Sequence, residues 1–68
     1  MTLDEALKKF ERHGFTYRIS VSKQRITHLL LQNPESKMTI VNKIKENERE
    51  NIVDWIKDAS YKWFGIDI

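Results

Sequence analysis

The chain has 68 residues and a mass of 8.2 kDa, and its twelve lysines and arginines against ten acidic residues give a net charge of +2. A chain of this length buries only about 60% of the surface that its unfolded form exposes, so we expect residues 1–68 to form a single domain without a deep substrate cavity. Because the sequence contains no cysteine, disulfides, thiolate metal sites and a thiol nucleophile are excluded.

The sequence predicts an N-terminal helix with a signal at each end. Thr2 and Glu5 fit a capping box, in which the Thr2 hydroxyl accepts a hydrogen bond from the amide of Glu5 and the Glu5 carboxylate accepts one from the amide of Thr2. Gly14 suits the left-handed residue that ends a helix, and Phe15 just beyond it can fold back onto Phe10. Between these signals one apolar stripe recurs at helical spacing, consisting of Leu3, Ala6, Leu7 and Phe10.

Three strands are predicted after this helix. Apolar and polar residues alternate over residues 15–21, as in a strand with one buried face, and a second strand over residues 25–32 follows a polar turn at 22–24. Residues 33–36 have turn chemistry, with a proline that presets φ, and residues 37–42 form the third strand. Together these strands predict an antiparallel meander.

The sequence leaves the buried face of the second strand open. In one alternative, the inward face of this strand consists of Ile26, His28 and Leu30. In the other alternative, the inward face consists of Thr27, Leu29 and Leu31. Apolar residues remain on the outward side of this strand in either case, because both sets contain leucine.

A second helix is predicted to begin between Asn42 and Asn47, with Asn47 as a candidate cap followed by acids in the first turn. Gly65 ends this helix after Phe64. Its apolar stripe consists of Ile52, Trp55, Ile56, Ala59 and Trp63. The order α-β-β-β-α predicts an α+β fold in two layers, with both helices on one face of a three-stranded antiparallel sheet.

Such an architecture leaves the other face of the sheet open. One interpretation is that a few leucines are simply exposed, as is common on soluble proteins. The other is a dimer or partner interface centred on Leu29 to Leu31, with Leu29 and Leu31 as candidate contacts, reached through the apolar face or by pairing with an unpaired edge strand.

Charge is segregated along the chain. Residues 18–45 hold six basic side chains and one acidic one, whereas residues 46–68 hold six acidic and three basic ones. The candidate phosphate contacts in the basic part are Arg18, Lys23, Arg25, Lys37 and Lys43. In the acidic part, Glu48, Asp54 and Asp58 are candidates for contacting a basic, nucleic-acid-binding groove of another protein.

Few catalytic patterns are present. The sequence has neither a metal-ligand motif nor a glycine-rich phosphate loop, so we expect no metal, no cofactor and no small-molecule substrate. Its longest apolar run is Leu29 to Leu31, and no secretion signal begins the chain, so we expect a soluble cytoplasmic protein without membrane contact. One chemistry remains: a histidine such as His28 can take the 2′-OH proton of RNA near neutral pH while cations stabilise the phosphorane.

The chain resembles HicA-type toxins, which are small mRNA interferases of toxin–antitoxin systems with a double-stranded-RNA-binding-like fold. The resemblance covers about residues 3–60 and rests on the element order, on Gly14-Phe15 after the first helix, on Thr27-His28 and on the Asn33-Pro34 turn. It implies that His28, counted back from Pro34, is a catalytic histidine. The family binds RNA with a basic surface that its second helix can join, whereas the second helix here is acidic.

Two functions of different classes follow. We expect a non-catalytic binding module or inhibitor, of the kind that phages and mobile elements encode, which engages a protein partner or a second copy of itself through the open sheet face and the acidic second helix. The alternative is an RNA-binding protein that uses the basic sheet segment, either without catalysis or as a HicA-like, metal-independent ribonuclease with His28 as the base.

Overall fold

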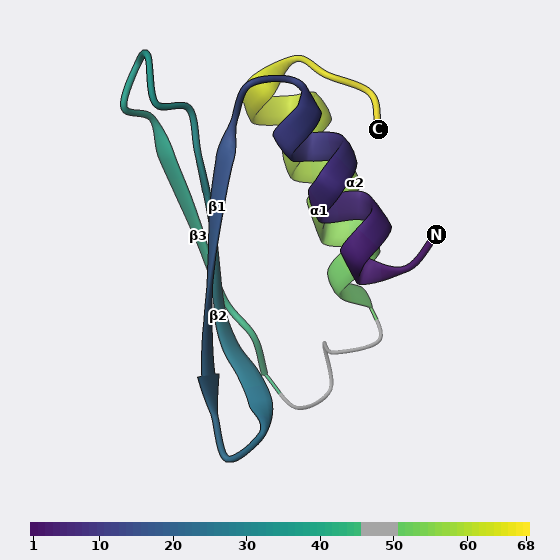
Figure 1. Cartoon of the computed structure of the whole chain (residues 1–68), viewed down its shortest axis with the longest axis vertical. Coiled ribbons are helices and arrows are strands. Elements are labelled where there is room, and N and C mark those ends of the chain that lie inside the picture. The colour runs from purple at the N-terminus through teal and green to yellow at the C-terminus, as the bar shows by residue number, and fades with distance from the viewer. Residues whose placement is uncertain (46–50) are drawn as a thin grey trace.

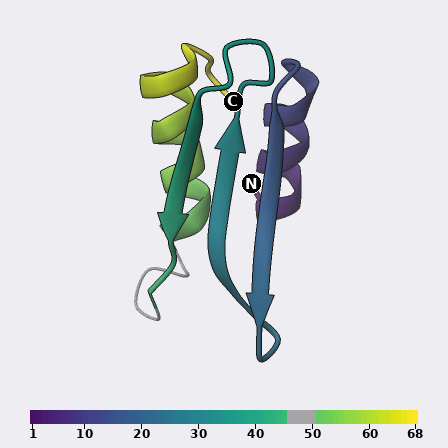
Figure 2. The same ribbon diagram turned by 90° about the vertical axis from the view of Figure 1, so that its left-hand side faces the viewer.

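The computed structural model describes residues 1–45 and 51–68. Its elements are α1 (Leu3–Arg12), β1 (Thr16–Ser22), β2 (Arg25–Gln32), β3 (Thr39–Lys43) and α2 (Ile52–Phe64). The strands form one antiparallel sheet in the order β1-β2-β3, which leaves β1 and β3 at the edges. Both helices lie on the same side of the sheet (Figures 1 and 2). The predicted α+β fold with the order α-β-β-β-α is confirmed.

The signals at both ends of α1 act as the sequence predicts, with one difference. The Glu5 amide donates to Thr2 Oγ1 at 3.2 Å, but the Thr2 hydroxyl, instead of the Thr2 amide, lies 3.1 Å from Glu5 Oε1. A hydroxyl can donate and accept at once, so it serves both halves of the cap. At the other end Gly14 has φ +90°, and the rings of Phe10 and Phe15 lie 5.2 Å apart.

The register of the sheet decides which face of β2 is buried. Leu31 pairs with Tyr17 and Leu29 with Ile19, so these leucines share the face of β1 that packs against the helices. Leu29 and Leu31 are 1% and 0% exposed. Leu30, the residue between them, therefore points to the opposite side.

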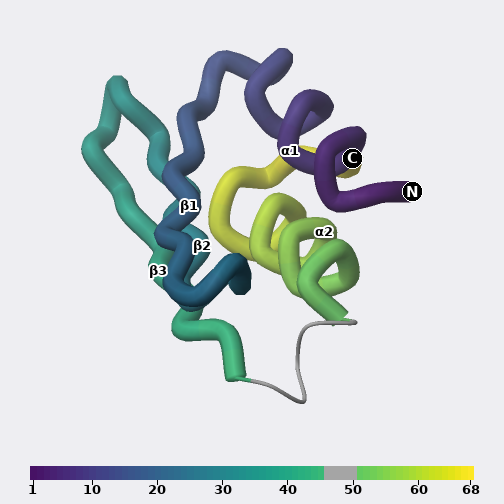
Figure 3. The backbone as a smooth tube through the Cα atoms, turned by 60° about the horizontal axis from the view of Figure 1, so that its bottom comes forward, coloured from purple at the N-terminus to yellow at the C-terminus, as the bar shows by residue number. Residues whose placement is uncertain are grey.

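The core lies between the sheet and the two helices. Figure 3 shows α1 and α2 alongside each other over one side of the sheet. The buried apolar side chains come from both helices, from β2 and from the residue that follows β3: Ala6, Leu7, Phe10, Leu29, Leu31, Ile44, Ile52, Ile56 and Ala59. Phe10 is central, since its ring contacts Phe15 and also Phe64, with centroids 5.0 Å apart in the second pair.

The sequence predictions for α2 need two corrections. The described helix begins at Ile52 after Asn51, later than expected, and the predicted cap at Asn47 lies outside the described residues. Trp63, expected in the buried stripe, is 48% exposed, and Phe64 takes its place in the aromatic cluster. Phe64 follows the buried Ser60 by four residues and so shares its face, whereas Trp63 is turned about 100° away from Phe64.

The β1–β2 hairpin turn is strained by its sequence. Lys23 and Gln24 both have positive φ, 52° and 65°. Side chains with a Cβ adopt this region at a cost of about 1–2 kcal/mol per residue, and two-residue hairpin turns of this kind favour Asn-Gly. Figure 1 shows the hairpin extending beyond the helices, and the side chains of Lys23 and Gln24 are exposed.

Replacing Lys23 by asparagine together with Gln24 by glycine is expected to stabilise the fold by about 1–2 kcal/mol, because both new residues tolerate positive φ. The measurement is the midpoint of urea unfolding followed by circular dichroism. Lys23→Ala is the control, since it removes the same charge but keeps the conformational cost. An unchanged midpoint in the double variant would show that the turn is not strained.

Ser60 is a buried polar residue of α2, at 0% exposure, and within the described part of the chain its Oγ has no hydrogen-bond partner. Ser60→Ala is therefore expected to stabilise the protein by about 1–2 kcal/mol, because it removes an unsatisfied hydroxyl and raises helix propensity. Thermal unfolding should shift upward by several degrees. Ala59→Ser, at the neighbouring buried position, should shift it downward, and a lower unfolding temperature for Ser60→Ala would refute the assignment.

Candidate binding surface

The side of the sheet away from the helices carries three rows of side chains. The pairing of the strands places Thr16, Gln32 and Thr39 in one row. The second row is Arg18, Leu30 and Val41. The third row is Ser20, His28 and Lys43. We call these side chains the outer face. Neighbours within a row have Cα atoms about 5 Å apart, so they form one continuous surface. Figure 2 shows the sheet from this side, with the helices behind it.

The outer face is basic with an apolar centre. Within its three rows there is no acidic residue, and Arg18, His28 and Lys43 are all exposed. Val41 is 56% exposed and lies beside the half-buried Leu30. An antiparallel sheet covered on one side normally presents polar residues on the other, so the pair of aliphatic side chains is the feature that distinguishes this face.

The structure corrects the expectation that Leu29 and Leu31 bind a partner. Both lie in the core beneath the helices, because their register partners Ile19 and Tyr17 belong to the face of β1 that packs there. The apolar residue of β2 that reaches the outer face is Leu30. The open face of the sheet is present as predicted, and Leu30 belongs to the stretch Leu29 to Leu31 on which the predicted interface is centred.

His28 is exposed on the outer face, between Ser20 and Lys43 in its row. Its Nδ1 lies 3.1 Å from Thr27 Oγ1, and the Thr27 hydroxyl donates to the carbonyl oxygen of Ser20 at 3.3 Å. The hydroxyl proton is then used, so Thr27 can only accept from the imidazole, and Nδ1 carries the hydrogen. In the neutral ring this leaves Nε2 free to take a proton.

A β-bulge places Thr27 in this position. Ser20 pairs with His28, whereas the next residue of β1, Val21, pairs with Ile26, so Thr27 has no partner residue on β1. The main-chain carbonyl of Thr27 accepts instead from the amide of Ile44, beyond the end of β3. Bulges commonly re-aim side chains in this way.

The predicted basic contacts are spread over the length of the sheet. Arg18 and Lys43 lie on the outer face, Arg18 in the second row and Lys43 in the third. Lys23 is at the tip of the β1–β2 hairpin, next to Arg25, the first residue of β2. Lys37, with φ +60°, lies in the β2–β3 loop at the opposite end of the sheet (Figure 2). The structure therefore places two of these five residues on the outer face, one on each edge strand, and the other three at the two ends of the sheet.

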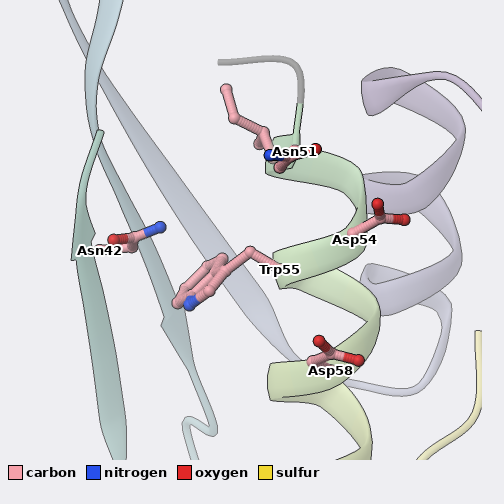
Figure 4. Close-up of a pocket in the computed structure, with 6 residues that line it drawn as sticks. Asn42, Asn51, Asp54, Trp55 and Asp58 are labelled. Atoms are coloured by element: carbon pink, nitrogen blue, oxygen red, sulfur yellow. The ribbon is translucent and has the colours of Figure 1, made fainter. Parts of the chain in front are cut away.

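The acidic residues of the second helix lie on a different surface. Asp54 and Asp58 are exposed on α2, in the helix layer, where they line a pocket of about 300 Å³ with Asn42 and the half-buried Trp55 (Figure 4). Glu48 lies outside the described residues. Because the helices cover the opposite side of the sheet from the outer face, the acids and the outer face form two surfaces instead of one.

A hollow of about 230 Å³ lies at one end of the outer face, and the sequence did not indicate it. It is lined by residues of the first two rows and by Tyr17 of β1: Thr16, Tyr17, Arg18, Leu30, Gln32 and Thr39. The alternation of apolar and polar residues over residues 15–21 predicts that Thr16 and Arg18 lie on the face opposite the buried one. Gln32 and Thr39 join them only through the register between strands.

In residues 1–45 and 51–68 there is no group of three histidine or acidic residues placed to hold a metal ion. Over the same residues, neither helix has the length and apolar character required to span a membrane. Compared with protein-family models, with curated proteins and with solved structures, the chain gave no significant match.

Proposed function

We propose that this chain is a small, non-catalytic binding module that docks an acidic segment of a protein partner on its outer face. One observation carries the proposal: an entire face of the sheet is left uncovered by the helices and combines two adjacent aliphatic side chains with exposed cations and no acid. Buried interface centres of this kind are apolar, and a charged rim of one sign selects partners of the other sign.

The composition of the outer face favours a protein over a single-stranded nucleic acid. Sheet surfaces that bind single strands stack the bases on aromatic side chains. The three rows of the outer face contain none, and the centre is formed by Leu30 and Val41. Aliphatic side chains instead pack against the apolar stripe of an amphipathic segment, so a helix laid across the sheet would cover them.

This proposal revises the predicted interface. The acids of α2 do not belong to it, because Asp54 and Asp58 lie in the helix layer. A module that only occupies the surface of its partner acts as an inhibitor, as short proteins of phages and mobile elements do. We propose that it acts in the cytoplasm. Self-association is the competing occupant, since a second copy could offer its acidic α2 to the outer face.

The test is capture of a partner from a lysate of the source cells by the tagged protein, before and after nuclease treatment. We expect capture to survive nuclease, to weaken with increasing salt, and to be lost in Leu30→Asp. Lys57→Gln, which changes an exposed residue of α2, is the matched control and should bind as the parent does. Loss of capture after nuclease treatment, or equal capture by Leu30→Asp, would refute the proposal. Light scattering of the isolated protein measures its molar mass and so shows whether a second copy occupies the outer face instead.

A second candidate is the metal-independent ribonuclease suggested by the resemblance to HicA-type toxins. What supports it is the exposed His28, whose Nε2 is left free by the contact of Nδ1 with Thr27. In this reaction Nε2 takes the 2′-OH proton, the 2′-oxygen attacks the adjacent phosphorus, and the 5′-oxygen leaves with a proton from water. A 2′,3′-cyclic phosphate and a 5′-hydroxyl result, and Lys43 and Arg18 would stabilise the phosphorane.

Incubation of a mixed RNA pool with the parent protein, His28→Ala and His13→Ala separates the two candidates. The binding module is expected to leave RNA intact in all three samples. A ribonuclease would cleave with the parent and with His13→Ala, whereas His28→Ala would be slower by about 10²- to 10⁴-fold, the usual contribution of a general base. Cleavage that depends on His28 in this way would replace the binding proposal.

A further inference from the structure

Resting on the proposed function, we infer that the hollow on the outer face is a subsite for a carboxylate side chain of the docked protein segment. The hollow has a volume of about 230 Å³ and is open to the side from which a partner would approach. It lies directly beside the apolar pair, because Arg18, Leu30 and Val41 occupy one row. The predicted ligand is therefore a glutamate or aspartate next to an aliphatic residue.

The hydrogen-bond donors at this hollow are free to bind an anion. With the residues that the structure describes, neither the Arg18 guanidinium nor the side-chain amide of Gln32 makes a hydrogen bond or ion pair. Arg18 opposes Leu30 and Gln32 opposes Thr16, so the two long side chains are diagonal neighbours whose Cα atoms lie about 7–8 Å apart. A carboxylate between them can accept two bonds from the guanidinium and another from the amide.

The threonines of the hollow supply no hydrogen-bond donors for an anion. Thr16 Oγ1 donates to the carbonyl of Gln32 at 3.5 Å, and Thr39 Oγ1 donates to the carbonyl of Lys37 at 3.4 Å. Their protons are engaged with the main chain, so these hydroxyls shape the wall while Arg18 and Gln32 supply the charge-assisted contacts. The hollow lacks an acidic lining residue, and a cationic ligand would meet the guanidinium of Arg18 instead.

The inference is tested by titrating the full chain, labelled with nitrogen-15, with a synthetic helical peptide that has one leucine face bordered by glutamates. A second peptide carries glutamine at every glutamate position, and a short single-stranded RNA is the third probe. We expect the glutamate peptide to shift the amide signals of Arg18, Leu30 and Gln32 and to bind about tenfold more tightly than the glutamine peptide. Arg18→Gln should remove this difference, and Lys57→Gln on α2 should not.

The outcomes distinguish this inference from the proposed function. If Leu30→Asp abolishes binding of the glutamate peptide while Arg18→Gln binds it as the parent does, the outer face docks a protein segment but the carboxylate subsite is wrong. If the glutamate peptide does not bind up to millimolar concentration, or if RNA binds the same residues more tightly, both are wrong. Chemical shifts of the unbound variants show directly whether each one is folded.

Discussion

Replacing Phe10 by alanine is expected to unfold most of the protein at 25 °C. Phe10 is 0% exposed, and its ring packs on Phe15 and Phe64, the residues that tie the end of α1 to the end of α2. Truncating a buried phenylalanine costs about 3–5 kcal/mol, whereas the core of a domain this small supplies a net stability of about the same size. The measurement is urea unfolding followed by circular dichroism and tryptophan fluorescence.

Two variants serve as controls for this result. Phe10→Leu keeps most of the volume and should cost about 1 kcal/mol, so it should remain folded. Trp63→Ala removes a larger ring from a position that is 48% exposed, and it should cost about 1–2 kcal/mol, less than Phe10→Ala. If Trp63→Ala proved as destabilising as Phe10→Ala, the assignment of Phe64 instead of Trp63 to the aromatic cluster would be wrong.

Adjacent leucines of β2 should respond in opposite ways to aspartate. Leu31→Asp places a carboxylate at 0% exposure, where the pairing residues Tyr17 and Ile40 offer no cation, and a cost on the order of 5 kcal/mol should unfold the protein. Leu30→Asp lies on the outer face beside Arg18 and should cost about 1 kcal/mol, mainly through lower strand propensity. We expect only Leu30→Asp to remain folded and to lose partner binding.

The two aspartate variants are compared by circular dichroism first and by binding second. A folded Leu31→Asp would mean that β2 presents its other face to the helices, which would overturn the register on which the outer face depends. A folded Leu30→Asp that still binds its partner would instead leave the register intact and remove the outer face as the interface. The stability of Leu31→Asp thus tests the buried face of β2, and partner binding by Leu30→Asp tests its outer face.

Leu30 and Val41 form an accessible apolar pair on the outer face. Because the helices cover one side of the sheet only, the side chains of the outer face contribute little to folding, and Leu30 and Val41 are left accessible in a small domain. Natural proteins usually avoid such apolar pairs on open sheets, since they invite association. Their presence beside exposed cations is the reason to assign a binding role to this face.

Local signals in the sequence predicted the elements well where neighbouring residues determine them. Thr2 caps α1 through Glu5, Gly14 and Gly65 end the helices with positive φ, and the polar turn at Lys23 joins β1 to β2. The described part of α2 begins at Ile52, and the predicted cap at Asn47 lies outside the described residues. Trp63 was misassigned because both Trp63 and Phe64 lie close to the predicted stripe.

The sequence by itself determined the order of helices and strands, the two-layer arrangement and the concentration of positive charge in the sheet, because periodicity, capping and charge are local properties. Only the tertiary structure decided that Leu29 and Leu31 are buried while Leu30 is presented with Arg18, His28 and Val41. It also separated Asp54 and Asp58 from that face. The reason is that strand register and helix packing join residues distant in the chain, and a shift of one residue in β2 would exchange its two faces.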